Sequence, residues 1–375
     1  MCAGSESRHE NRTGFRQGGE NPMSMATETK TIAPEAVRGA RLNGTARPAS
    51  VMDRVAFQAL IADDLAAVER AIAGTAEVPV ALLSKTLQLV LGPGGKRLRP
   101  TLVLLASHAN PRASLQRRVD LAAAAELLHT ATLVHDDVID LAESRRGAPT
   151  VNHVFNNALA VLTGDYLFGQ SGALVASLGS PAIMRVFSWA VMEVVQGEML
   201  RPSVGPDLDL TERDYLAKIR GKTAALLAMA CETGAMLDND DAVVRKAHHD
   251  YGMSLGMAFQ IVDDILDFTA TEAELGKPVG HDLEQGTITL PSLIYLRANP
   301  GDTIVRAHFT GGDGLGEGAT KAAVEAVRAS GAIDGARLRA AAYARDAIAQ
   351  LAPLPRTPSR DALEALASYV ISRHD

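Results

Sequence analysis

The sequence has little cysteine and few aromatic side chains. Of its 375 residues, two are cysteine and only 4% are aromatic. Cys2 and Cys231 are far apart and have no neighbouring cysteines, so they cannot build a disulfide framework or a zinc site. We therefore expect a protein of the reducing cytoplasm, in which Cys231 is a small core residue.

Long apolar runs are also missing. The longest uncharged stretch, residues 166–184, is long enough to span a bilayer but contains Gln170, three glycines, three serines and Pro181. This composition favours a helix–loop–helix over a transmembrane helix. The first 50 residues lack the apolar segment of a signal peptide, and we expect residues 1–50 to be a disordered N-terminal extension.

A basic face is not expected, because the formal net charge is −7. This charge argues against a nucleic-acid partner. The chain instead has 47% apolar residues, in alanine-rich segments such as LAAAAELL at 121–128. Few segments alternate as strands do, so we predict an all-α protein. Helices are expected at about 52–73, 80–91, 98–108, 115–140, 152–178, 181–199, 211–236, 240–268, 289–298, 317–329, 334–350 and 359–373.

One short acidic pattern occurs twice in these segments. The copies are DDVID and DDILD, which contain Asp136, Asp137 and Asp140, and Asp263, Asp264 and Asp267. On a helix, the first and last aspartate of each copy share a face, where like charges repel, and aspartate is a poor residue inside a helix. A hard divalent cation is the natural counter-charge, and Mg²⁺ combines a few carboxylates with waters and substrate phosphates.

Two other interpretations of the acidic motifs are open. The aspartates could form solvated acidic faces, although their neighbours, such as Leu133, are apolar. His135 and Asp136 could instead be the centre of a His–Asp metal phosphohydrolase. That enzyme needs further histidines at metal spacing, but His248 and His249 are adjacent and do not face the same way on a helix. It also gives the second motif no role.

Cationic residues accompany the acidic motifs, as magnesium-bridged phosphates would require. GGKRLRP at residues 94–100 follows a glycine turn, and its side chains and backbone can approach one anion if a helix begins there. It is not a Walker A loop, because Arg97 stands where Ser or Thr is required. Further candidates for holding phosphates are His129, Arg145, Arg146, Lys222, Thr223 and Lys277.

Seven motifs in order resemble the trans-isoprenyl diphosphate synthases, or polyprenyl synthetase family. They are GGKRLRP (94–100), LLHTATLVHDDVID (127–140), RRGAPT (145–150), GDYL (164–167), GKTAAL (221–226), FQIVDDILD (259–267) and GKPVGHDLEQGTITLP (276–291). The resemblance extends over about residues 80–372. It implies a large all-α bundle around a central cavity, normally a homodimer, with residues 51–375 as the catalytic domain.

The resemblance also implies the chemistry and the site residues. The substrates would be isopentenyl diphosphate and an allylic diphosphate, with about three Mg²⁺ per site. The metal ligands would be Asp136, Asp140 and Asp263, supported by Asp137, Asp264 and Asp267. Isopentenyl diphosphate would be bound by Lys96, Arg99, His129 and Arg146. The allylic diphosphate would be bound by Arg145, Lys222, Thr223, Gln260 and Lys277. Thr287 stands where many members have a second lysine, which weakens this clamp by one cation.

In the implied reaction, the allylic C1–O bond ionises while Mg²⁺ and cationic side chains hold the leaving diphosphate. The isopentenyl double bond attacks the cation, and a proton is lost to the diphosphate.

Bulky aromatics one turn before the first motif stop growth at short products in this family. Here Ala131 and Thr132 occupy that turn, with Ala123 and Ala124 behind them. We predict a medium- or long-chain all-trans product of about thirty to fifty carbons, and membrane contact when it is released. Alternatively, Leu127 or Phe168 blocks the path.

Three further functions stay open at this point. A short-chain farnesyl or geranylgeranyl diphosphate synthase would use the same motifs. A class I terpene cyclase normally mixes Asn, Ser or Thr and Glu in its second motif, and a cyclising pocket suits a more aromatic sequence. A non-catalytic subunit of a heteromeric synthase usually loses its aspartates, whereas all six are present here.

Overall fold

The structure is a computed structural model that describes residues 51–92, 95–108, 112–145, 147–200, 202–204, 207–237, 239, 241–271, 279–310 and 318–372. The expected N-terminal extension at 1–50 and the candidates Arg146 and Lys277 lie outside the described residues.

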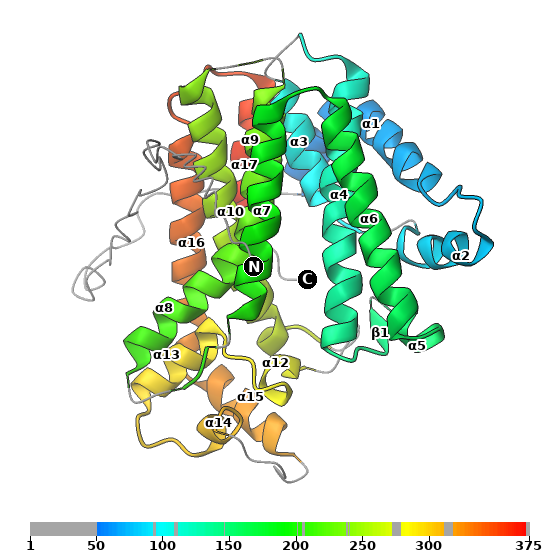
Figure 1. Cartoon of the computed structure of the whole chain (residues 1–375). Coiled ribbons are helices and arrows are strands. Elements are labelled where there is room, and N and C mark those ends of the chain that lie inside the picture. The colour runs from blue at the N-terminus through cyan, green and yellow to red at the C-terminus, as the bar shows by residue number, and fades with distance from the viewer. Residues whose placement is uncertain are drawn as a thin grey trace, which may run out of the picture. The chain divides into compact units, whose positions relative to one another are not determined.

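The fold is all-α, as predicted (Figure 1). The helices before the second motif are α1 (Val51–Gly74), α2 (Ala81–Val90), α3 (Leu98–His108), α4 (Leu115–Ile139), α5 (Val151–Val154), α6 (Asn157–Ser177), α7 (Pro181–Met199), α8 (Leu208–Ile219), the π-helical turn η2 (Arg220–Ala224) and α9 (Ala225–Met236). From the second motif onward they are α10 (Ala242–Thr269), α12 (His281–Glu284), α13 (Leu290–Ala298), α14 (Ile304–Ala307), α15 (Ala319–Ala329), α16 (Ala332–Gln350) and α17 (Pro358–Ser372). A small antiparallel pair, β1 (Ser144–Arg145) and β2 (Ala148–Pro149), follows α4.

Local sequence signals explain where the long helices begin. The side chains of Ser114, Asn156 and Ser180 accept backbone N–H bonds at the starts of α4, α6 and α7. Asp241 does the same for α10. These caps satisfy donors that have no partner inside the helix. The cap at Asn156 also corrects our prediction of one helix over 152–178, because it starts α6 afresh after the short α5.

The main bundle is packed from aliphatic side chains on α1, α3, α4, α6, α7 and α9. In Figure 1, α4 and α6 run side by side, and they are in extensive contact. Alanines allow this close approach: Ala123 and Ala124 have no exposed surface, and the Ser171 hydroxyl of α6 donates to the Ala124 carbonyl at 2.7 Å. Cys231 is fully buried in the same core, as expected, and burial raises the pKa of its thiol.

A second apolar cluster joins α8, α13, α15 and α16 to the C-terminal half of α10. Helix α10 therefore spans both clusters: Leu255 and Ala258 lie in the first, whereas Ile261 and Ile265 lie in the second. The second acidic motif lies in this half of α10, among side chains of the second cluster.

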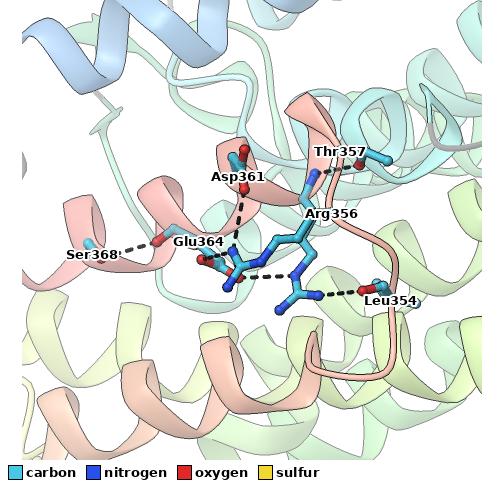
Figure 2. A network of polar contacts seen from close by, with 7 residues as sticks. Leu354, Arg356, Thr357, Asp361, Glu364 and Ser368 are labelled. Carbon is cyan, nitrogen blue, oxygen red and sulfur yellow. Dashed lines mark hydrogen bonds and ion pairs between the residues drawn. The ribbon is translucent and has the colours of Figure 1, made fainter.

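The last helix, α17, begins in a surface network of ion pairs. Figure 2 shows Asp361 and Glu364 of α17 facing Arg356, which contacts them at 3.4 and 3.0 Å. Arg360 also reaches Glu364, at 3.1 Å. Such pairs contribute little individually when exposed, and burial of Leu363 and Leu366 contributes more to fixing α17.

None of the described helices is both long and apolar enough to cross a membrane.

Candidate active site

Two glycines bring α7 and η2 together at the centre of the site. A side chain at Gly197 would lie 2.4 Å from the Lys222 backbone nitrogen, and one at Gly221 would lie 2.7 Å from the Glu193 carbonyl oxygen. Only glycine allows this approach. Here the Ala225 N–H donates to the Arg220 carbonyl, five residues back, and π-helical turns of this kind occur often at functional sites. The predicted helix over 211–236 therefore begins earlier, at Leu208, and is interrupted by η2.

Lys222 points from η2 at the first acidic motif. Its Nζ lies 3.3 Å from Asp136 Oδ2 and 2.5 Å from Glu198 Oε2. Burial lowers the pKa of Lys222, but the two carboxylates outweigh it and hold the pKa above its usual value. Burial raises the pKa of Asp136, an effect that Lys222 opposes and Glu198 strengthens. The lysine thus neutralises a carboxylate that is otherwise costly to bury.

The next residue of η2 reaches the second motif. The Thr223 hydroxyl donates to Gln260 Oε1 at 2.6 Å, and Gln260 Nε2 donates to Asp264 Oδ1 at 3.0 Å. The Tyr215 hydroxyl donates to the other oxygen of Asp264 at 2.6 Å. Asp264 is buried, and burial followed by the charge of Asp282 raises its pKa well above the usual range. Asp264 therefore orients its neighbours inside the protein, while Asp263 is half-buried.

Asp267 ties the second motif to the segment after it. Its Oδ2 accepts the backbone N–H of Asp282 at 3.0 Å, and its carbonyl accepts the N–H of Gly280 at 2.9 Å. These contacts bring residues 279–282 to the motif that lies 12 or more residues earlier, and Gly280 adopts a φ of 80° that favours glycine.

The second aspartate of the first motif also has an internal partner. Arg145 Nε donates to Asp137 Oδ1 at 2.7 Å, so the strand after α4 is fastened to its end. Burial raises the pKa of Asp137, and Arg145 opposes this. Asp140, by contrast, is exposed at the last turn of α4. Asp136 and Asp140 are therefore the more accessible carboxylates of this motif, while Asp137 and Arg145 pair with each other.

His135 does not join Asp136 in a metal centre. Its Nε2 lies 3.1 Å from the Val161 carbonyl oxygen of α6, and its ring packs against Gly164 and Phe168. The imidazole thus fills the α4–α6 contact, on a different side of the helix from Lys222. This position argues against the His–Asp phosphohydrolase interpretation.

The residues predicted to bind isopentenyl diphosphate, where the structure describes them, lie on α3, its preceding loop and α4. Helix α3 begins at Leu98, as the GGKRLRP motif predicted. Lys96 is exposed, and Arg99 and His129 are half-buried. Arg97 differs from these, because its guanidinium pairs with the buried Glu126 and the partly exposed Glu69. It is therefore not among the cations available to a phosphate.

Two residues of the site were not found from the sequence. Glu198 pairs with Lys222, and Tyr215 hydrogen-bonds to Asp264. The sequence hints at a role for Glu198 in one way, because a carboxylate follows Gly197 directly in an apolar helix. It holds no local sign of a role for Tyr215, whose partner Asp264 lies 49 residues away.

The residues predicted to set product length are more tightly packed than expected. Ala131 has no exposed surface, and Leu127 is equally buried. Thr132 is half-buried, and its hydroxyl donates to the His129 carbonyl at 2.7 Å. Thr132 thus lies on the open face of α4 with His129 and Asp136, whereas Ala131 lies against the core.

The donor set fits a hard cation that takes part of its coordination from a ligand. In the described part of the chain, no three carboxylate, histidine or cysteine side chains converge tightly enough to hold a metal alone. Asp136, Asp140 and Asp263 nevertheless supply oxygen donors from the two motifs that η2 connects. Mg²⁺ usually binds one or two carboxylates and completes its octahedron with waters and phosphate oxygens.

The sequence profile of the polyprenyl synthetase family matches residues 80–327, which include both acidic motifs and η2. The chain belongs to this family. It is 39% identical to heptaprenyl diphosphate synthase component 2 of Geobacillus stearothermophilus, over 85% of this chain and 98% of the relative. It is 37% identical to octaprenyl diphosphate synthase of Escherichia coli (strain K12), over 84% of this chain and 97% of the relative.

The fold agrees with this membership. A crystal structure of a polyprenyl synthase from Caulobacter crescentus CB15, complexed with calcium and isoprenyl diphosphate, matches with a TM-score of 0.79 and 35% identity. The match covers 88% of this chain and 99% of the synthase.

Proposed function

We propose that this polyprenyl synthetase condenses isopentenyl diphosphate with an allylic diphosphate, head to tail, to make a medium- or long-chain all-trans polyprenyl diphosphate. The observation that carries the proposal is η2, which joins the two acidic motifs through consecutive residues. Lys222 faces Asp136, and Thr223 is connected through Gln260 to Asp264. A diphosphate between the motifs would therefore meet carboxylate-bound metal on both sides and a lysine between them.

The residues of this site suit ionisation of an allylic diphosphate. Mg²⁺, when bound, supplies positive charge that stabilises the leaving diphosphate. Asp136, Asp140 and Asp263 would hold about three such ions, with the diphosphate oxygens completing their coordination. Lys222 is a preorganised donor that contributes further positive charge where the oxyanion develops. Lys277 and Arg146 belong to the same proposal but lie outside the described residues.

Isopentenyl diphosphate would bind at Lys96, Arg99 and His129, on α3, its preceding loop and α4. No side-chain base is required, because the departing diphosphate can accept the proton that the condensation releases. The cytoplasm remains the expected location.

The length of the product is supported by Thr132, a small side chain on the open face of α4 one turn before Asp136, and by the relatives, which are named for heptaprenyl and octaprenyl products. A role as a non-catalytic subunit has less support, because Asp136, Asp140 and Asp263 are all present and half-buried or exposed.

Exposed apolar side chains on α6 and α7 support the proposed homodimer. The two helices contact each other and expose large apolar side chains, from 41% at Val161 to 76% at Met199. The others are Leu162, Met192 and Val195. A second copy of the chain would cover this surface, and changing Met192 and Val195 to glutamate should then yield monomers in light-scattering measurements.

The central experiment uses purified protein, both diphosphates and Mg²⁺ or Mn²⁺. We expect prenyl transfer only with metal, and a loss of about a thousandfold or more in Asp136→Ala or Asp263→Ala without unfolding. Appreciable turnover in excess chelator would contradict the proposal.

A further inference from the structure

Arg97 is held by two carboxylates, the buried Glu126 and Glu69, whose side chain is 41% exposed. Its Nε and Nη2 donate to the two oxygens of Glu69 at 2.6 and 2.9 Å, and its Nη1 donates to Glu126 Oε1 at 3.0 Å. The side chains of Arg97 and Glu126 are only 10% and 7% exposed. Glu69 belongs to α1 and Glu126 to α4, so one guanidinium joins two helices to the loop before α3.

The backbone of Arg97 is also constrained. Its φ is 44°, in the left-handed region that non-glycine residues rarely adopt, and Gly95, two residues earlier, has a φ of 129°. The Arg97 carbonyl accepts the N–H of Thr101 at 3.0 Å and so begins α3. A loop with this conformation is not held by its own backbone preferences. The side-chain bonds of Arg97 supply the restraint.

This restraint lies between the proposed ligands of isopentenyl diphosphate. Lys96 directly precedes Arg97, and Arg99 follows it by two residues. Glu126 lies three residues before His129, on the same face of α4. The cluster therefore connects the segment that carries Lys96 and Arg99 to the helix that carries His129.

We infer that Arg97, with Glu69 and Glu126, is a positioning residue that fixes Lys96 and Arg99 relative to His129 for binding isopentenyl diphosphate. This inference rests on the proposed function. A planar guanidinium is needed because it forms three directed bonds at once, whereas a lysine provides a single point charge. Loss of the fork should let the loop relax and should separate the two groups of diphosphate ligands.

The test is Arg97→Lys, which keeps the charge but loses the fork. We expect the KM for isopentenyl diphosphate to rise about tenfold, as for loss of one hydrogen bond to a charged group. The KM for the allylic diphosphate and kcat should stay within about twofold. An unchanged KM for isopentenyl diphosphate, or an equal rise in both KM values, would overturn the inference.

A double variant separates positioning from stability. Arg97→Met with Glu126→Gln removes a buried charge together with its partner, so the folded state should regain most of the stability lost in Arg97→Met alone. The KM for isopentenyl diphosphate should nevertheless remain raised. If it returned to the wild-type value together with the melting temperature, Arg97 would have only a structural role.

Asp64→Asn is the matched control. Asp64 Oδ2 contacts Arg118 at 3.0 Å and His108 at 2.8 Å, so this cluster joins the same helices α1, α3 and α4 at comparable burial but away from the loop. We expect a lower melting temperature and an unchanged KM for isopentenyl diphosphate. Wild-type protein that fails to condense the two diphosphates would refute the proposed function. A wild type that condenses them, with Arg97→Lys indistinguishable from Asp64→Asn, would refute this inference alone.

Discussion

Lys222→Met should have opposite effects on metal binding and on catalysis. The substitution keeps the length of the side chain but removes the charge that lies 3.3 Å from Asp136 and 2.5 Å from Glu198. In the absence of substrate, a metal ion that binds Asp136 has to displace Lys222 from the carboxylate. The variant removes this competition, so it should bind Mn²⁺ more tightly.

The size of the effect follows from the geometry. Two unit charges 3.3 Å apart interact by about 5 kcal/mol at an effective dielectric constant of about 20, and by about 1 kcal/mol in bulk water. Because the Lys222 side chain is 35% exposed, screening brings the net value close to the lower figure. A difference of about 1.4 kcal/mol corresponds to about tenfold tighter Mn²⁺ binding.

Catalysis should change in the other direction. The donor that Lys222 provides to the leaving diphosphate acts on developing charge, and loss of such a donor typically costs about a hundredfold to a thousandfold in kcat. Calorimetric titration of the substrate-free protein with Mn²⁺ at pH about 8, together with steady-state kinetics, measures both quantities. Lys246→Met is the control, since the Lys246 side chain is 74% exposed and pairs with Asp250 of the same helix. Weaker Mn²⁺ binding in Lys222→Met would show that Lys222 does not compete with the metal for Asp136, and an unchanged kcat would show that it does not act on the leaving diphosphate.

Three other substitutions test separate parts of the structure. Ala131→Phe should shorten the product to about fifteen to twenty carbons and, because Ala131 is fully buried, should cost about 1–3 kcal/mol of stability; mass analysis that finds an unchanged product would contradict this. Glu232→Gln should be destabilising at neutral pH and much less so in acid. Burial raises the pKa of Glu232, but the hydrogen bonds and charges of His249 and Arg245 outweigh burial and lower the pKa below the usual 4.5. The folded state therefore gains stability above that value and loses it as the pH falls through the lowered pKa, and urea unfolding at several pH values should show the difference shrinking. Gly197→Ala should destabilise the protein by about 1–3 kcal/mol and lower activity, because its methyl group would meet the Lys222 backbone at 2.4 Å; a variant with full activity and an unchanged melting temperature would argue against the close α7–η2 contact.

The features that the sequence predicted well depend on local patterns. The predicted helix starts at residues 115 and 181 are the observed starts of α4 and α7, where the structure shows Ser114 and Ser180 as caps. The paired aspartates stood out because three carboxylates are unfavourable within an apolar helix. Both signals are contained in a short stretch of sequence, so no tertiary information is needed to read them.

The features that were missed depend on contacts between distant segments. The π-helical turn at Arg220–Ala224 is associated with the close approach of Gly197 and Gly221. Arg97 and Arg99 look equivalent in GGKRLRP, yet only the structure shows that Arg97 pairs with Glu69 and Glu126, which lie 28 and 29 residues away. Sequence spacing cannot predict such partners, because helix packing decides which side chains meet.

The mass of the dephosphorylated product decides whether this protein makes a medium- or long-chain linear polyprenyl diphosphate. Purified wild-type protein would be incubated with Mg²⁺, an allylic diphosphate primer and excess isopentenyl diphosphate. The products would then be dephosphorylated, and the masses of the extracted prenyl alcohols would be measured by mass spectrometry. We expect an all-trans series that ends at about thirty to fifty carbons, with no cyclic hydrocarbon. A product that stops at about fifteen carbons, a cyclised product, or recovery of the primer unchanged would contradict it.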